Sequence, residues 1–167
     1  IEKHFNIIKT NTVVIKDVND DEVIDIINHM KNFKSEIRFI EYMDVGESNK
    51  WDPSKVVSSE SLLESINEHY SLEQMKTETS STAKKWHIND SNSSIGLISS
   101  ITQPFCSSCN RARLSVDGKL FTCLFASNGF DIKSVIRSDG YEEKLLEFFK
   151  NIWMERSDQY SQIRFSS

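Results

Sequence analysis

The chain has 167 residues, of which 38% are hydrophobic, and it carries a formal net charge of -5. This length is enough for one substantial domain or for two small ones. The acidic charge argues against a nucleic-acid partner, because such proteins usually carry a strongly basic surface. No apolar run approaches the roughly 18 residues that a membrane span needs, so no membrane partner is expected either.

The first part of the sequence predicts a strand, a helix and a second strand. The β-branched run at residues 12–15 predicts the first strand, and residues 37–45 predict the second. Between them, apolar side chains recur at helical spacing over residues 23–30, after an Asn- and Asp-rich stretch at 17–22 that suits a helix N-terminus. This order predicts a parallel pair of strands with a right-handed crossover. Functional groups in such sheets gather at the carboxyl ends of the strands, which draws attention to residues 42–44.

The rest of the sequence predicts shorter strands and two more helices. In chain order the predicted elements are a loop at 51–53, a helix at 59–70, a short strand containing Trp86 and Ile88, a strand at 95–101 ended by Pro104, paired strands at 111–116 and 120–124, and a helix at 141–155. The Asp117-Gly118 pair between the two paired strands is a strong hairpin signal. The last helix is expected to pack through its apolar face, formed by Leu145, Leu146, Phe149, Ile152 and Trp153.

All three cysteines of the chain lie within eighteen residues. Their spacing is C-x2-C-x13-C, formed by Cys106, Cys109 and Cys123. Alternation along a strand would place Cys109, Arg111 and Arg113 on one face. We expect a bulged three-residue turn at 117–119, which would place Cys123 opposite Arg113, whereas a two-residue turn would point it away. Soft thiolate ligands beside guanidinium groups, which suit phosphate or carboxylate, predict a metal centre that also binds an anion.

Three kinds of site are compatible with these cysteines. Clustered cysteines, odd in number, in a chain whose start does not read as a signal peptide favour a reducing, cytoplasmic compartment and metal binding. Incidental buried thiols would have no reason for the tight spacing. A structural zinc ion would need a fourth ligand, and none of the four histidines lies within the motif: His4, His29, His69 and His87. An iron–sulfur cluster usually takes four cysteines, so three would leave one iron open to a substrate.

Residues 105–124 resemble the C-terminal cluster motif of the GTP 3′,8-cyclases, the molybdenum cofactor biosynthesis protein A family of the radical S-adenosylmethionine (SAM) superfamily. The family pattern F-C-x2-C-N-R-x-R-L-x-x-D-G-x-L-x-x-C-L matches throughout this segment. Residues 9–13, 38–43 and 95–100 also resemble segments of the family. Matching segments are therefore spread through nearly all of the chain.

The resemblance implies an α/β fold in two parts. Residues 1–48 would form the end of an incomplete (β/α) radical SAM barrel. Residues 49–167 would form an α+β region with a β-hairpin, which binds an auxiliary 4Fe–4S cluster and GTP. The chain lacks the C-x3-C-x2-C triad that binds the SAM-cleaving cluster in this family. We therefore expect a fragment without the first half of the barrel, which forms no deoxyadenosine from SAM on its own.

Members of the family are lyases that use SAM radical chemistry to convert GTP to (8S)-3′,8-cyclo-7,8-dihydroguanosine 5′-triphosphate in molybdenum cofactor (molybdopterin) biosynthesis. The resemblance assigns site residues by position: Cys106, Cys109 and Cys123 as ligands of the 4Fe–4S cluster, Lys9, Arg111, Ala112 and Arg113 as contacts of GTP, and Met43 as a contact of SAM. The implied partners are GTP, SAM with a second 4Fe–4S cluster in the full-length protein, and a downstream cyclic pyranopterin monophosphate synthase. A truncated barrel would also expose strand edges and apolar helix faces, so we expect the chain to pair with the missing N-terminal barrel half or with a second copy in a homodimer. The alternative is a metal-stabilised structural module, or an auxiliary-cluster module of another radical SAM maturase.

Overall fold

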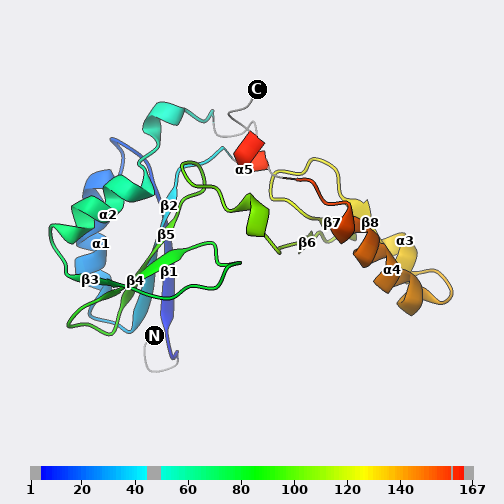
Figure 1. Ribbon diagram of the computed structural model, residues 1–167, viewed down its shortest axis with the longest axis horizontal. Coiled ribbons are helices and arrows are strands. Elements are labelled where there is room, and N and C mark those ends of the chain that lie inside the picture. Colours follow the sequence, from blue (N-terminus) through cyan, green and yellow to red (C-terminus); the bar gives the residue numbers. More distant parts are fainter. Residues whose placement is uncertain (1–4, 45–49, 159, 164–167) are drawn as a thin grey trace. The chain divides into compact units, whose positions relative to one another are not determined.

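The computed structural model describes residues 5–44, 50–158 and 160–163, and it divides into two compact units, residues 1–108 and 109–167 (Figure 1). The predicted boundary between residues 48 and 49 lies outside the described residues. Each unit has its own sheet, with five strands in the first and three in the second. None of the described helices is both long and apolar enough to cross a membrane.

The first unit is built on a mixed sheet. In spatial order its strands are β1 (Ile8–Val14), β2 (Ser35–Glu41), β5 (Ser94–Ile98), β4 (Lys84–Ile88) and β3 (Leu72–Gln74). β1, β2 and β5 run parallel, whereas β4 and β3 are antiparallel to their neighbours. The predicted parallel pairing of the first two strands is therefore confirmed, and α1 (Val23–Met30) lies in the connection between them. The radical SAM barrel itself stays a prediction.

Two helices cover one face of this sheet (Figure 1). α1 and α2 (Ser59–Asn67) both turn an apolar stripe inward, with Val23, Ile27, Leu62 and Ile66 buried. These side chains share one core with alternate strand residues, namely Val14, Ile37, Phe39, Ile88, Ile95 and Leu97. Successive side chains of a strand point to opposite faces, so the residues between them lie on the other face. On that face Lys9, Arg38 and Lys85 gather around Glu36.

Several boundaries in the first unit differ from the predicted ones. β1 and β2 both begin earlier than predicted, and β2 ends at Glu41. α2 ends at Asn67 and β5 at Ile98, each three residues before the predicted end. The strand containing Trp86 and Ile88 is confirmed as β4, but β3 was missed because its three residues carry no apolar alternation. The predicted loop at 51–53 leads into the 3₁₀ helix η3 (Pro53–Lys55), capped by the Asp52 carboxylate.

The Asn- and Asp-rich stretch does not cap α1 as predicted. Residues 20–22 form the short 3₁₀ helix η2 (Asp20–Glu22), and no side chain caps either η2 or α1. The Asn19 side chain accepts a hydrogen bond from the Ile15 N–H at 2.8 Å and donates one to the Val13 carbonyl at 3.0 Å. Its amide therefore closes the turn at the end of β1, because both contacts reach back to the strand and not forward to the helix.

One buried carboxylate joins three segments of the first unit. Glu41 is the last residue of β2 and is fully buried. It accepts hydrogen bonds from the backbone N–H groups of Ser59, Ile101 and Thr102, each at 2.8 Å, and from the Thr102 hydroxyl. Glu41 therefore anchors both the first turn of α2 and the segment after β5 that leads to η4 (Cys106–Ser108).

The second unit consists of a small antiparallel sheet and three helices. Its strands are β6 (Arg113–Leu114), β7 (Lys119–Phe121) and β8 (Phe130–Asp131), and its helices are α3 (Ile132–Ile136), α4 (Tyr141–Met154) and α5 (Tyr160–Ile163). The predicted hairpin is confirmed between β6 and β7. Gly118 supplies the left-handed turn residue, with φ of 83°, and its N–H donates to the Ser115 carbonyl at 3.0 Å.

The predicted register of this hairpin is wrong. Arg113 pairs with Phe121, not with Cys123, because Ser115 and Lys119 close the turn and leave residues 116–118 in the loop. β6 has only two residues, so Cys109 and Arg111 precede the strand and do not share its face by alternation.

The predicted apolar face of α4 is also largely exposed. Ile152 is buried, but Leu146, Phe149 and Trp153 are 59%, 37% and 41% exposed. The strands of this unit are two or three residues long, so its sheet is too small to cover a helix of 14 residues.

Replacing Glu41 by Gln is expected to lower the free energy of unfolding by about 2–3 kcal/mol, because hydrogen bonds to a charged group are stronger and the amide presents donors to buried N–H groups. Urea unfolding followed by circular dichroism measures this change. The matched control is Glu64→Gln, at an exposed position of α2. Equal stability of the two variants would contradict the anchoring role.

Candidate functional site

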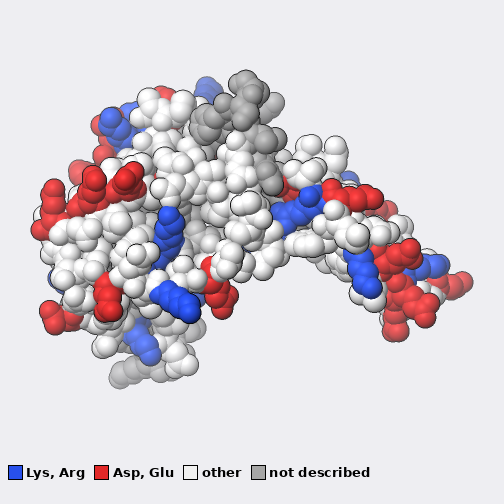
Figure 2. Space-filling model, viewed as in Figure 1, with Lys and Arg blue, Asp and Glu red and all other residues white. Residues whose placement is uncertain are grey.

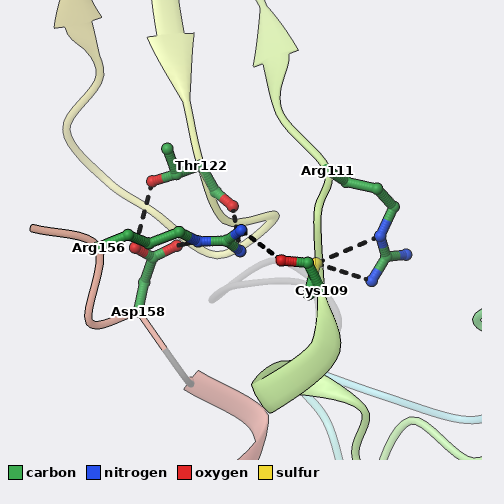
Figure 3. Close-up of polar contacts among 5 residues, drawn as sticks. All are labelled: Cys109, Arg111, Thr122, Arg156 and Asp158. Atoms are coloured by element: carbon green, nitrogen blue, oxygen red, sulfur yellow. Dashed lines mark hydrogen bonds and ion pairs between the residues drawn. The ribbon is translucent and has the colours of Figure 1, made fainter. Parts of the chain in front are cut away.

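Cys109 and Arg111 are joined through their side chains in the second unit (Figure 3). The Arg111 guanidinium donates two hydrogen bonds to Cys109 Sγ, from Nε at 3.3 Å and from Nη2 at 3.1 Å. Both residues are partly buried. The sequence predicted these two residues on one face of a strand, but both precede β6, so their contact does not arise from strand alternation.

A second guanidinium, that of Arg156, binds the backbone of two segments, at Cys109 and at Thr122. Arg156, which follows α4, donates to the Cys109 carbonyl at 2.6 Å and to the Thr122 carbonyl at 2.8 Å. Its Nε pairs with the Asp158 carboxylate at 3.2 Å, and only 10% of its side chain is exposed. The Thr122 hydroxyl also donates to Asp158, at 3.2 Å, which closes the network shown in Figure 3.

These contacts favour the thiolate form of Cys109. Burial raises the pKa of the Cys109 thiol, but the Arg111 backbone N–H and the guanidinium groups of Arg156 and Arg111 outweigh this effect and hold the pKa below its ordinary value. The thiolate is the form of cysteine that acts as a nucleophile and as a metal ligand. Cys109 is therefore electrostatically suited to ligate a metal.

The three cysteines are all free and partly exposed. Cys106 begins η4 in the first unit, whereas Cys109 and Cys123 belong to the second. Within the described part of the chain, no three His, Cys, Asp or Glu side chains are grouped as a metal site. The donor chemistry fits an iron–sulfur cluster, because three reduced thiols are present and one has a lowered pKa. The ligand set itself stays a prediction.

The other predicted anion-binding residues of the second unit, Ala112 and Arg113, lie next to Arg111. Both are exposed. Arg113 begins β6, and its side chain makes no hydrogen bond or ion pair with the residues that the structure describes. Its guanidinium donors therefore face solvent, where a ligand can reach them.

One helix of each unit carries several acidic side chains. Figure 2 shows acidic side chains gathered over α2 and over α4. These are Glu60, Glu64, Glu142, Glu143 and Glu147 on the two helices. A negative net charge is therefore compatible with a local site that binds an anion.

The predicted site residues Lys9 and Met43 belong to the first unit. Lys9 lies on β1 and pairs with Glu36 at 3.7 Å, and the same carboxylate pairs with Arg38 at 2.6 Å and Lys85 at 3.0 Å. Three cations around one carboxylate leave this face of the sheet with a net positive charge. Met43 is partly buried and follows the carboxyl end of β2, as predicted.

Sequence reasoning missed two residues that organise these charges. Arg156 follows the last long helix in an ordinary polar stretch, and no motif distinguishes it from other surface arginines. Glu36 could have been found, because it lies in the same strand as Arg38 and is separated from it by one residue, which places the two on one face.

A family model described as Molybdenum Cofactor Synthesis C matches residues 35–162. The chain belongs to this family. The matched residues include all three cysteines, Arg111, Arg113 and Arg156. Lys9 lies before the matched range.

Proteins named GTP 3′,8-cyclase from Staphylococcus epidermidis and Staphylococcus aureus are similar to this Molybdenum Cofactor Synthesis C chain. Each is 44% identical to it over 159 residues. The aligned region covers 94% of this chain and 47% of each relative, so the chain spans about half the length of these curated relatives.

The stability of the first unit is expected to depend on the charge of Glu36. Burial raises the pKa of the Glu36 carboxyl, but hydrogen bonds from Lys85 and Arg38 outweigh it and hold the pKa below its ordinary value. The charged carboxylate therefore stabilises the fold above its unfolded-state pKa, and this contribution is lost as the pH falls through the folded-state pKa.

The measurement is urea unfolding of wild type and Glu36→Gln over a series of pH values from neutral to acidic. The variant is expected to be less stable at neutral pH and to lose less stability on acidification. Glu73→Gln, at an exposed position of β3, serves as control and should follow wild type. Parallel curves for Glu36→Gln and wild type would contradict the expectation.

Proposed function

We propose that this chain is the C-terminal, substrate-binding part of a GTP 3′,8-cyclase in molybdenum cofactor biosynthesis. The observation that carries the proposal is its 44% identity, over 94% of its length, to proteins of that name. The geometry of the second unit supports it, because the Cys109 thiol has a lowered pKa. The Arg111 guanidinium donates to this thiol, and the Arg156 guanidinium donates to the Cys109 carbonyl.

Cys106, Cys109 and Cys123 are the proposed ligands of a 4Fe–4S cluster. Four thiolates are the usual complement, so a cluster with three would offer one iron at which a substrate atom can bind. The proposed role of these cysteines is to present three thiolates, and the chain has no fourth cysteine to occupy the remaining iron. The free state of the cysteines and the lowered pKa of Cys109 support this role.

Arg111, Ala112 and Arg113 are the proposed contacts of GTP beside that cluster. Arg113 is exposed and its guanidinium has the fixed fork that suits phosphate oxygens. Arg111 already binds a thiol and would neutralise negative charge at the cluster. Ala112 lies between them and is exposed, so its backbone is accessible.

Lys9 and Met43 are the proposed contacts of the GTP phosphates and of SAM in the full-length protein. The net positive charge around Glu36 supports the role of Lys9, because a Lys ammonium binds phosphate as a point charge. Free thiols agree with a cytoplasmic location, where cysteines stay reduced. SAM cleavage would require the second 4Fe–4S cluster of the full-length protein.

Replacing Arg113 by Ala is expected to weaken GTP binding on the order of 10- to 100-fold, because a hydrogen bond to a charged group contributes roughly 1.5–3 kcal/mol. Anaerobic titration calorimetry of the iron-reconstituted chain measures this affinity. The preparation should hold about four iron and four sulfide per chain. Zinc without sulfide in a well-folded preparation would refute the cluster.

The matched control for this experiment is Arg137→Ala. Arg137 is an exposed arginine of the same unit at the end of α3, remote in sequence from the cysteines. GTP affinity should be unchanged in this variant. If Arg113→Ala binds GTP as well as Arg137→Ala does, Arg113 is not a substrate contact.

A further inference from the structure

Arg156 connects the two chain segments that carry Cys109 and Cys123. One guanidinium donates both to the Cys109 carbonyl, at 2.6 Å, and to the Thr122 carbonyl, at 2.8 Å. The first carbonyl belongs to the peptide unit that follows the Cα of Cys109, and the second to the peptide unit that precedes the Cα of Cys123. Because peptide units are planar, fixing these two carbonyls restricts the backbone at both cysteines.

The guanidinium is itself held in place. Its side chain is only 10% exposed, and its Nε pairs with Asp158 at 3.2 Å. Its Cζ atom lies over the Trp153 ring, 4.9 Å from the ring centre. Thr122 donates to the same Asp158 carboxylate, at 3.2 Å. A planar fork with its other donors engaged can bridge two carbonyls at a fixed separation, which a flexible ammonium group cannot do.

A second contact holds the chain on the other side of Cys123. The rings of Phe125 and Tyr160 stack with their centres 4.5 Å apart and their planes inclined by 18°. Thr122 and Phe125 lie on either side of Cys123 in the sequence, and both contact the segment after α4. That segment therefore fixes the loop of Cys123 at two points.

We propose that Arg156 is a positioning residue that sets the separation of Cys109 and Cys123 so that both thiols can bind one metal centre. The proposal rests on the proposed function, since it concerns two of the cysteines assigned there to the cluster. Residues that orient metal ligands from outside the coordination sphere commonly change metal affinity when replaced. Arg156 contacts the backbone at both ligands of the second unit, whereas the Arg111 guanidinium donates to the Cys109 thiol.

The test measures the affinity of the two thiols for a metal ion, and it needs neither the iron–sulfur cluster nor enzyme activity. The full chain is prepared reduced and metal-free in a Cys106→Ser background, which leaves only Cys109 and Cys123. It is titrated with Cd²⁺, a soft ion that prefers thiolates, and binding is followed by the thiolate-to-cadmium absorption. A further Cys123→Ser exchange gives the affinity of a single thiol.

In this background, Arg156→Gln is expected to lower the Cd²⁺ affinity on the order of 10- to 100-fold. Arg156→Lys should also lower it, because Lys keeps the charge but lacks the fork. Arg137→Gln, the control, should bind as the parent does. Circular dichroism checks the fold of each variant. If Arg156→Gln does not fold, the Cd²⁺ affinity of Arg156→Lys is the measurement that tests the proposal.

Two results would overturn the proposal. One is an unchanged Cd²⁺ affinity in folded Arg156 variants. The other is a parent that binds Cd²⁺ no more tightly than the single-thiol variant, since the two thiols would then not act together. If instead the proposed function is wrong and the role of Arg156 is right, Cd²⁺ binding still depends on Arg156, but the wild-type chain takes up no iron and sulfide.

Discussion

The first unit depends on the Glu41 carboxylate, which accepts four hydrogen bonds at the end of a central strand. A buried carboxylate is costly unless its oxygens are satisfied, and here three backbone N–H groups and a hydroxyl satisfy them. The same contacts fix the first turn of α2 and the segment after β5. That segment continues to Cys106, so the interaction that completes the fold also fixes the start of the cysteine motif.

The second unit is held in a different way. Among its described residues, few hydrophobic side chains are buried, namely Leu120, Ile132 and Ile152, and its strands are two or three residues long. So small a core stabilises little, and the polar network of Arg156, Asp158 and Thr122 supplies the contacts that order the loops around Cys109 and Cys123. The guanidinium that orders these loops is therefore the one proposed above to position Cys109 and Cys123.

Much of the first unit could be predicted from the sequence because apolar periodicity reports burial directly. The parallel β1–β2 pair, α1, α2 and β4 all follow from such patterns. The errors arise where polar contacts decide the structure. Asn19 closes a turn and does not cap a helix, and the Ser115–Lys119 contact sets the hairpin register. Cys109 and Arg111 were expected on one strand face, and they contact each other before β6 begins. The contact of Arg156 was not predicted, since a contact between residues 47 positions apart leaves no pattern in one sequence.

The central claim is that this chain presents three thiolates to a 4Fe–4S cluster whose remaining iron is open to GTP. Mössbauer spectroscopy tests it most directly, on the chain reconstituted with iron-57 and compared with and without GTP. The account predicts the spectrum of a 4Fe–4S cluster in which one iron component changes when GTP is added. A cluster whose spectrum is the same in both samples, or a folded chain that retains no iron, would contradict the account.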